Sequence, residues 1–378
     1  MCAKIKGKSK AAEKIDGSWA ELTEELLGRI ADDDLGSWKR EWAMLEPARN
    51  PVTGSFYSGG NLALLYHAMI ERQTSDPRFC GFDQAKKQGW AVKKGATGIP
   101  IARFCQTLYD EAGKRVPGQS KMSAAEKRAY VQEHEGSKLV NSTKALYVFS
   151  LAEMDGPEPF ARENRKMADM PVIDSLISHS PCPVQEVPSD GACYIPALDC
   201  INMPVREQFK DLEGLASTLL HEQVHSTGHP SRLNREIRNK FGSEAYAREE
   251  LVAELGSAMA YSRLGLAYPE LEGGASDRGL DNRAAYLKSW ASNLEDPVDA
   301  IKSVFGDASR AAAMIVAEHE RDRERKPEHG AVEQEATRDV VVPDEADEAV
   351  GLESLEAVAR GAAVPGGGAG ASREEVTR

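Results

Sequence analysis

The segment LASTLLHEQVHSTGH contains the pattern HExxH within a stretch of helical periodicity. On a helix, residues four positions apart share one face, so His221 and His225 can bind one metal ion together. Glu222 then lies close enough to take a proton from a water molecule at that ion. These residue types and spacings predict a zinc-dependent hydrolase, with Zn²⁺ as the cofactor and Glu222 as the general base.

The alternative is that HExxH arose by chance on a solvated helix face. Apolar residues surround the motif in the sequence, at Leu215, Leu219, Leu220 and Val224. They predict a largely buried helix, and a buried histidine or glutamate without a partner is costly. A metal ion is the simplest partner for all three side chains.

A catalytic zinc ion usually has three protein ligands. The pattern HExxHxxGxxH is excluded because Ser231 stands where its third histidine belongs, and His229 comes two residues early. The later segment YAREELVAELGSAM supplies Glu249, Glu250 and Glu254, of which the last two stand four residues apart, where like charges need a cation nearby. By analogy with zinc enzymes that use a glutamate ligand, we expect Glu250 to be the third ligand and Glu254 to contact a ligand histidine. The reverse order of these two glutamates stays open.

The chain has 378 residues, of which 41% are hydrophobic and 28% are charged, as in soluble proteins with two domains and a tail. No stretch approaches the roughly 20 apolar residues of a membrane span, and no secretory leader is visible, so a cytoplasmic location without a membrane partner is expected. The net charge is -13, but it is unevenly distributed. Residues 326–378 hold twelve acidic and five basic side chains, whereas residues 38–106 hold five acidic and ten basic ones.

The helices and strands that must position these residues can be predicted from periodicity and composition. They indicate an α+β fold with two domains, each with its own core. Residues 1–17 are expected to form a disordered basic arm, and residues 18–155 a mixed α+β domain with a loose insertion at 107–143. Residues 156–325 are expected to form a mainly helical domain, followed by a disordered acidic tail at 326–378. The helices of the second domain are predicted at 209–225, 243–264, 282–294 and 297–321.

The first domain interleaves basic and aromatic residues, as proteins do that bind single-stranded DNA with cationic grooves and aromatic platforms. The residues expected to contact DNA are Lys86, Lys87, Lys93, Lys94 and Arg103, followed by Tyr57, Asn61 and Trp90. Aromatic residues at such spacings more often belong to a core, which is the expectation for Trp38, Trp42, Phe82 and Phe104. The signal is weak when taken alone.

Several motifs taken together resemble one known family. The segments HEQVHSTGHPSRLNR, KFGSEAYAREELVAELGSAM and NRAAYLKSWASNL are similar to the metallopeptidase domain of ArdC-like antirestriction proteins. The earlier segments NPVTGSFYSGGNLALL and FDQAKKQGWAVKKGATGIPIARF look like the single-stranded-DNA-binding domain of the same family. The resemblance spans roughly residues 17–320. Gln223 and Ser226 depart from it, since the family usually has an apolar residue and an aromatic residue there.

The resemblance implies an N-terminal domain that binds single-stranded DNA, a C-terminal zincin-like domain, and a role in protecting or processing DNA that enters a cell on a mobile element. The first hypothesis is a metallopeptidase that cleaves an unknown protein associated with that DNA. The second is a non-catalytic protein that coats the DNA or blocks a restriction enzyme, with a structural or vestigial zinc site. Glu222 favours the first, because a structural zinc site needs ligands but no general base.

Overall fold

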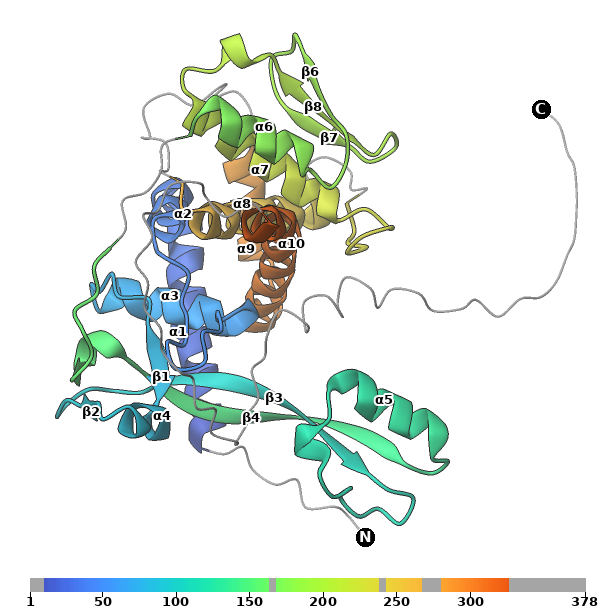
Figure 1. Ribbon diagram of the computed structural model, residues 1–378. Helices are drawn as coiled ribbons and strands as arrows, with labels where there is room; N and C mark the ends of the chain where they lie inside the picture. Colours follow the sequence, from blue (N-terminus) through green and yellow to red (C-terminus); the bar gives the residue numbers. More distant parts are fainter. Residues whose placement is uncertain (1–9, 163–167, 238–242, 267–279, 326–378) are drawn as a thin grey trace, which may run out of the picture.

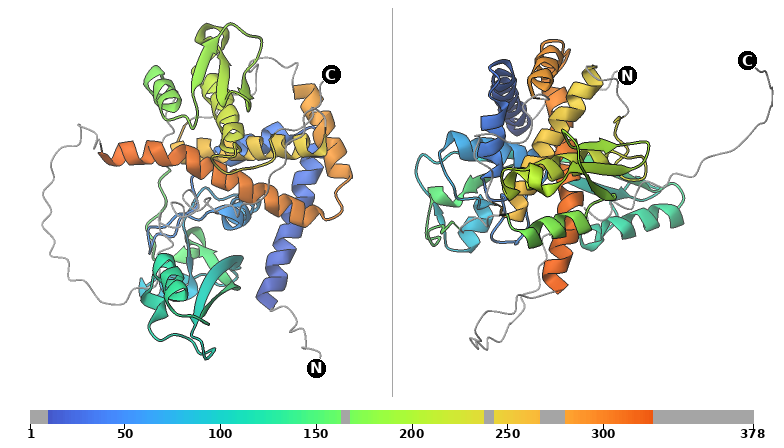
Figure 2. Two further views of the ribbon diagram at one scale, coloured as in Figure 1. Left: turned by 90° about the vertical axis from the view of Figure 1, so that its right-hand side faces the viewer. Right: turned by 90° about the horizontal axis from the view of Figure 1, so that it is seen from above.

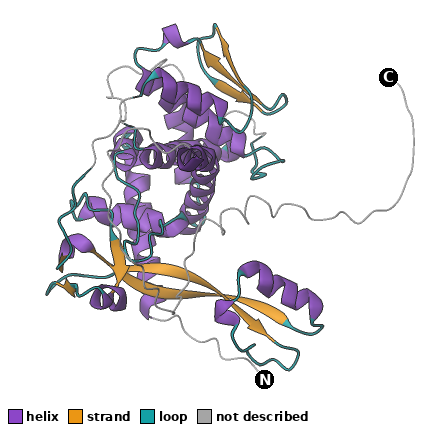
Figure 3. Ribbon diagram, in the orientation of Figure 1, coloured by secondary structure: helices purple, strands orange, loops and turns teal. Residues whose placement is uncertain are grey.

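The computed structural model describes residues 10–162, 168–237, 243–266 and 280–325 (Figure 1). In the folded structure of these residues, strands lie at two opposite ends and helices lie between them (Figure 3). None of its helices is both long enough and apolar enough to span a bilayer. The expected acidic tail at 326–378 and the first nine residues of the expected basic arm lie outside the described residues.

The N-terminal part combines helices with a three-stranded antiparallel sheet in the order β1-β4-β3 and a two-stranded pair, β2-β5. Its strands are β1 (Phe79–Gly81), β2 (Ala91–Val92), β3 (Ile99–Tyr109), β4 (Lys138–Ser150) and β5 (Met154–Asp155). Its helices are α1 (Lys10–Ala31), α2 (Leu35–Ala43), α3 (Gly59–Glu71), α4 (Phe82–Lys87) and α5 (Ala124–Glu133), with a short 3-10 turn, η1, at Gln119–Lys121 and another, η2, at Leu151–Glu153. The mixed α+β character predicted for this part is confirmed.

Two expectations for this part are wrong. Helix α1 begins at Lys10, inside the segment expected to be a disordered arm. Residues 107–143, expected to be a loose insertion, form the far end of the β3–β4 hairpin together with α5, which project to one side of the molecule (Figure 1). Helix α5 starts with a capping box in which Ser123 Oγ accepts from Glu126 N and Ser123 N donates to Glu126 Oε2.

The C-terminal part is mainly helical, as predicted. Its sheet has the order β6-β8-β7, which leaves β7 at an edge. The strands are β6 (Val184–Val187), β7 (Cys193–Ile195) and β8 (Cys200–Pro204), and β8 is followed by a 3-10 turn, η3, at Arg206–Gln208. The helices are α6 (Met170–Ser178), α7 (Leu212–Thr227), α8 (Glu244–Leu264), α9 (Leu280–Ser292) and α10 (Pro297–Arg325), and the last four match the predicted ones within a few residues. Helix α10 runs along α8, and both cross the middle of the molecule (Figure 2).

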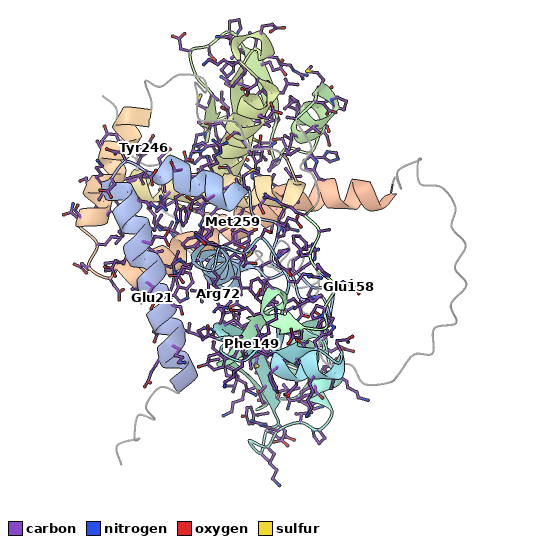
Figure 4. The ribbon with its side chains drawn as sticks, turned by 90° about the vertical axis from the view of Figure 1, so that its left-hand side faces the viewer. Glu21, Arg72, Phe149, Glu158, Tyr246 and Met259 are labelled. Atoms are coloured by element: carbon purple, nitrogen blue, oxygen red, sulfur yellow. The ribbon has the colours of Figure 1, made fainter. Side chains whose placement is uncertain are left out.

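The two parts share one hydrophobic core, so the expectation of separate cores is wrong. Apolar residues from Trp19 to Val316 form a single buried cluster. Trp42 of α2 stacks on Phe305 of α10 with ring centroids 5.2 Å apart. Met259 of α8 lies where the helices of both parts meet (Figure 4). The N-terminal helices therefore support the helices that hold the predicted metal site.

Candidate functional site

Helices α7 and α8 present the residues that the sequence nominates for chemistry. Asp211 caps α7 by accepting a hydrogen bond from Gly214 N at 2.7 Å, and Ser243 caps α8 by accepting one from Tyr246 N at 3.2 Å. The helices pack closely at Gly256, where an added Cβ would lie 3.0 Å from Val224 Cγ1. This close packing brings the glutamates of α8 up to the histidines of α7.

Three predicted ligand side chains meet at one point. The Nε2 atoms of His221 and His225 lie 3.2 Å apart. Glu250 Oε2 lies 3.6 Å from His221 Nε2, and Glu250 Oε1 lies 3.7 Å from His225 Nε2. Ligand atoms about 2.0–2.2 Å from a tetrahedral ion are roughly 3.3–3.6 Å apart, so this donor set has the spacing of one metal site. Two imidazoles and a carboxylate are also the donors that a zinc enzyme uses.

The other nitrogen of each histidine faces a second carboxylate. His225 Nδ1 lies 3.2 Å from Glu249 Oε1, and His221 Nδ1 lies 3.3 Å from Glu254 Oε1. A carboxylate can only accept, so each Nδ1 carries a proton, and Nε2 is the ring nitrogen that faces the centre of the site and can bind a metal ion. Glu254 thus lies where the sequence reasoning placed it, beside a histidine, whereas the position of Glu249 was not anticipated.

Each of these outer carboxylates contacts a cation. Arg235 donates to both oxygens of Glu249, from Nη2 to Oε1 at 2.7 Å and from Nε to Oε2 at 3.0 Å. Lys39, which belongs to α2 of the N-terminal part, donates to Glu254 Oε2. Sequence reasoning missed both cations. No local pattern marks Lys39, because 215 residues separate it from Glu254.

These carboxylates change the protonation of the site. Burial lowers the pKa of His225, but Glu249, Glu250 and Glu222 outweigh it and raise the pKa to about 9. Burial also opposes the charge on Glu249, yet the hydrogen bonds from His225 and Arg235 hold its pKa below the usual value. The site therefore has a strong preference for positive charge at its centre, which a proton or a metal ion can satisfy.

Glu222 follows His221 on α7, has 5% of its surface exposed, and acts on His225 through its charge. Its Oε2 accepts a hydrogen bond of 2.7 Å from Tyr194 N on the edge strand β7. The Tyr194 hydroxyl in turn donates to Asp199, and Arg232 donates to Asp199 Oδ2 at 3.0 Å. The hydrogen bond from Arg232 is the main reason that the pKa of Asp199 is lowered. This network fixes the strand that orients the Glu222 carboxylate.

The two residues that depart from the family pattern are both buried on α7. Gln223 is fully buried, and its Nε2 donates to Leu176 O on α6 at 2.8 Å. Ser226 Oγ donates to Gln223 O at 2.7 Å. The first bond joins α7 to α6, the second lies within α7, and neither residue belongs to the set of donors that meets at the site.

The predicted DNA-binding cations are distributed over one end of the N-terminal sheet and along β3. Lys86 and Lys87 are exposed on α4, and Lys93 and Lys94 are exposed in the turn after β2. Lys93 Nζ also donates to Ala152 O at 3.2 Å. Arg103 lies farther along β3, opposite Lys144 of β4.

The three other predicted DNA contacts have structural partners. The hydroxyl of Tyr57 donates to Phe79 O, and burial raises its pKa. Asn61 lies within α3, whose N-cap position is Ser58; its Oδ1 accepts from Ala102 N and its Nδ2 donates to Ala102 O. Trp90 is half-buried against the small apolar cluster under α4.

Two aromatic residues assigned to the core are exposed instead. Trp38 and Trp42 are buried as expected, but Phe82 is 56% exposed and Phe104 is 80% exposed. Phe104 borders a pocket of about 410 Å³ that Trp19 also lines. An exposed ring beside basic residues is a better candidate for base stacking than Tyr57, and alternation along β3 alone could not reveal it.

Comparison with known proteins relates each part to a described family. Residues 18–149 match the N-terminal domain of the anti-restriction factor ArdC, and residues 171–310 match a zincin-like metallopeptidase domain. The chain is 30% identical over 306 residues to DNA primase TraC of Escherichia coli. That match covers 78% of this chain but 27% of the primase, so the chain spans about a quarter of that relative's length.

Solved structures of the antirestriction protein ArdC from plasmid R388 share the fold over nearly their whole length. The metal-free form has a TM-score of 0.59 and 26% identity, covering 80% of this chain and 98% of that one. The form with bound Mn(II) has a TM-score of 0.57 and 27% identity, covering 79% and 97%. With both domains matched in the same order, the chain belongs to the ArdC-like antirestriction protein family, with an ArdC-type N-terminal domain followed by a zincin-like metallopeptidase domain.

Proposed function

We propose that this protein is a metal-dependent peptidase of the HExxH type that acts in the cytoplasm on proteins associated with single-stranded DNA. The observation that carries the proposal is the meeting of His221, His225 and Glu250 at ligand spacing with the Glu222 carboxylate buried beside them. The ArdC neighbour is described in a Mn(II)-bound form, and the donor set fits zinc equally well, so we propose Zn²⁺ as the resident ion.

The chain's own residues divide the chemistry between them. His221, His225 and Glu250 would hold the ion, which supplies Lewis acidity and lowers the pKa of a bound water. Glu222 takes the proton from the attacking water and returns it to the leaving amine. The hydrogen bond from Tyr194 N to Glu222 Oε2 occupies one carboxylate oxygen and leaves the other for this transfer.

The metal assignment predicts which substitutions remove the ion. His221→Ala and Glu250→Ala each delete a donor atom, so both variants are expected to lose the single ion per chain. Glu254→Ala deletes only the partner of His221 Nδ1, so it should bind the ion more weakly than the wild type but still retain it. Metal content after dialysis, measured by plasma mass spectrometry, checks this and also identifies the metal.

Full retention of metal in both His221→Ala and Glu250→Ala would contradict the site. Loss of metal in Glu254→Ala together with retention in Glu250→Ala would reverse the roles of the two glutamates.

For the N-terminal domain we propose single-stranded DNA as the partner. Exposed lysines on α4 and after β2 offer contacts to phosphate, and the exposed ring of Phe104 offers a surface on which a base can stack. This assignment replaces Tyr57 and Asn61 with Phe104, because both have partners within the domain.

The two kinds of contact predict different salt dependence. Replacing Lys93 and Lys94 with alanine should weaken binding of an oligo(dT) strand and reduce the log-log salt slope by about 0.7 for each phosphate that the variant no longer neutralises. Phe104→Ala should weaken binding by about 1–3 kcal/mol for one stacked base and leave the slope unchanged. Fluorescence anisotropy at several salt concentrations measures both quantities.

If the double lysine variant kept both affinity and slope, the DNA path would lie elsewhere on the domain. If Phe104→Ala bound as tightly as the wild type, that ring would have no part in stacking.

A further inference from the structure

We infer that the N-terminal domain supplies a working part of the metal centre, through Lys39 and its ion pair with Glu254. This inference rests on the proposed metal site and adds a positioning residue from outside the metallopeptidase domain. The contacts around the two histidines repeat the same order of groups on both sides of the site.

On each side a histidine Nδ1 faces a carboxylate, and that carboxylate contacts a cation. The first chain runs from His225 to Glu249 to Arg235. The second runs from His221 to Glu254 to Lys39. Such outer partners fix the tautomer and the ring orientation of a metal ligand and increase its basicity. The two chains differ in origin, because Arg235 follows α7 directly whereas Lys39 belongs to α2.

The balance of charge around the site also depends on Lys39. Four carboxylates act on the histidine pair: those of Glu249, Glu250 and Glu254 face its ring nitrogens, and that of Glu222 acts on His225 through its charge. Two cations, Arg235 and Lys39, oppose them directly, so a divalent ion makes this set neutral. The side chains of Lys39 and Glu254 are only 11% and 15% exposed, and water screens their charges weakly. Removing Lys39 would leave one excess negative charge in a largely buried site.

The packing of α2 holds Lys39 in this position. The neighbouring Trp38 and the later Trp42 are buried in the shared core, which fixes the orientation of the helix. Beyond the helix, Leu45 O accepts a hydrogen bond of 2.6 Å from Ser262 Oγ on α8. Helix α2 is therefore anchored to α8, the helix that carries Glu254. Because coupling between two sites is reciprocal, metal binding in turn stabilises the docking of α2.

The test measures Zn²⁺ affinity of the full chain by competition with a chromophoric chelator, starting from metal-free protein, and repeats it with Mn²⁺. Lys39→Met should bind Zn²⁺ about 10–100-fold more weakly than the wild type, as expected when an outer partner of a ligand is removed. Lys39→Arg, which keeps the charge, should restore most of the affinity. Lys288→Met is the matched control, because Lys288 also joins distant segments by an ion pair, to Asp33, and lies outside the site.

A second variant shows whether Lys39 acts through Glu254. Glu254→Gln should weaken Zn²⁺ binding to a similar extent. The double variant, Lys39→Met with Glu254→Gln, should have a Zn²⁺ affinity no lower than that of the single variant that binds less tightly, because both substitutions remove the same interaction. Unchanged affinity in Lys39→Met, an equal loss in Lys288→Met, or additive losses in the double variant would each overturn the inference. If Lys39→Met does not fold, unchanged affinity in Glu254→Gln would overturn it instead. A wild type that binds no metal would refute the proposed site itself, which is a different outcome.

Discussion

Glu222→Gln is expected to abolish hydrolysis while the protein still folds, binds its metal and binds single-stranded DNA. General acid-base groups contribute about 10²–10⁴-fold to a rate, and each of the other carboxylates that the structure describes around the histidine pair already faces a histidine, so none can replace Glu222. The glutamine Oε1 can still accept the hydrogen bond from Tyr194 N, so the edge strand keeps its position. Cleavage of unfolded casein, followed with and without a single-stranded oligonucleotide, measures the loss.

Glu213→Gln is the matched control for this variant. Glu213 lies on the same helix, has 7% of its surface exposed and accepts a hydrogen bond from Ala168 N at 2.9 Å. Its replacement removes a buried charge from α7 without touching the metal site, so hydrolysis should be retained. Equal loss of activity in both variants would mean that buried charge on α7, and not proton transfer, is what matters.

The same variant separates the two functional hypotheses in cells. If Glu222→Gln protected incoming DNA as well as the wild type does, protection would not need peptide hydrolysis. The protein would then act by coating DNA or by blocking a restriction enzyme, even with an intact metal site. Loss of protection in Glu222→Gln but not in Glu213→Gln would tie protection to proton transfer by Glu222.

The inner residues of the site could be nominated from the sequence because a helix fixes their geometry. Spacing of four residues places His221 beside His225, and the same rule pairs Glu250 with Glu254. Lys39 and Tyr194 obey no such rule, since each reaches the site through the tertiary fold. Which outer carboxylate contacts which histidine also depends on how α7 crosses α8, and helical periodicity does not specify the crossing.

The fold could likewise be predicted only where local sequence patterns determine the structure. Long periodic segments indicated the helices of the C-terminal part, whereas the capping pair Ser123 and Glu126 was a local signal for α5 that polar composition obscured. Burial of aromatic residues was the least predictable feature. Phe104 and Trp42 are both aromatic residues in a basic segment. Trp42 is buried because α2 packs it against Phe305 of α10, whereas Phe104 lies exposed on β3, and residue spacing alone does not distinguish the two.

Phe305→Ala is expected to destabilise the whole described chain, not one domain of it. Phe305 of α10 is fully buried and contacts three tryptophans of the N-terminal helices, with ring centroids 5.8 Å from Trp19, 6.2 Å from Trp38 and 5.2 Å from Trp42. Replacing a buried phenylalanine with alanine costs about 3–5 kcal/mol, a large share of the roughly 5–15 kcal/mol that stabilises a folded protein. Urea unfolding should therefore shift to lower midpoints.

The shared core further predicts that tryptophan fluorescence and far-ultraviolet circular dichroism report one coincident transition for this variant, as for the wild type. Phe104→Ala is the matched control, because the same atoms are removed from a side chain that is 80% exposed, and its midpoint should stay near that of the wild type. Two separate transitions, with only one of them shifted by Phe305→Ala, would mean that the domains unfold independently. A single shifted transition would mean that the helices carrying the proposed metal ligands are stable only while α1 and α2 are docked against them. Loss of the N-terminal packing would then also disrupt the proposed metal site.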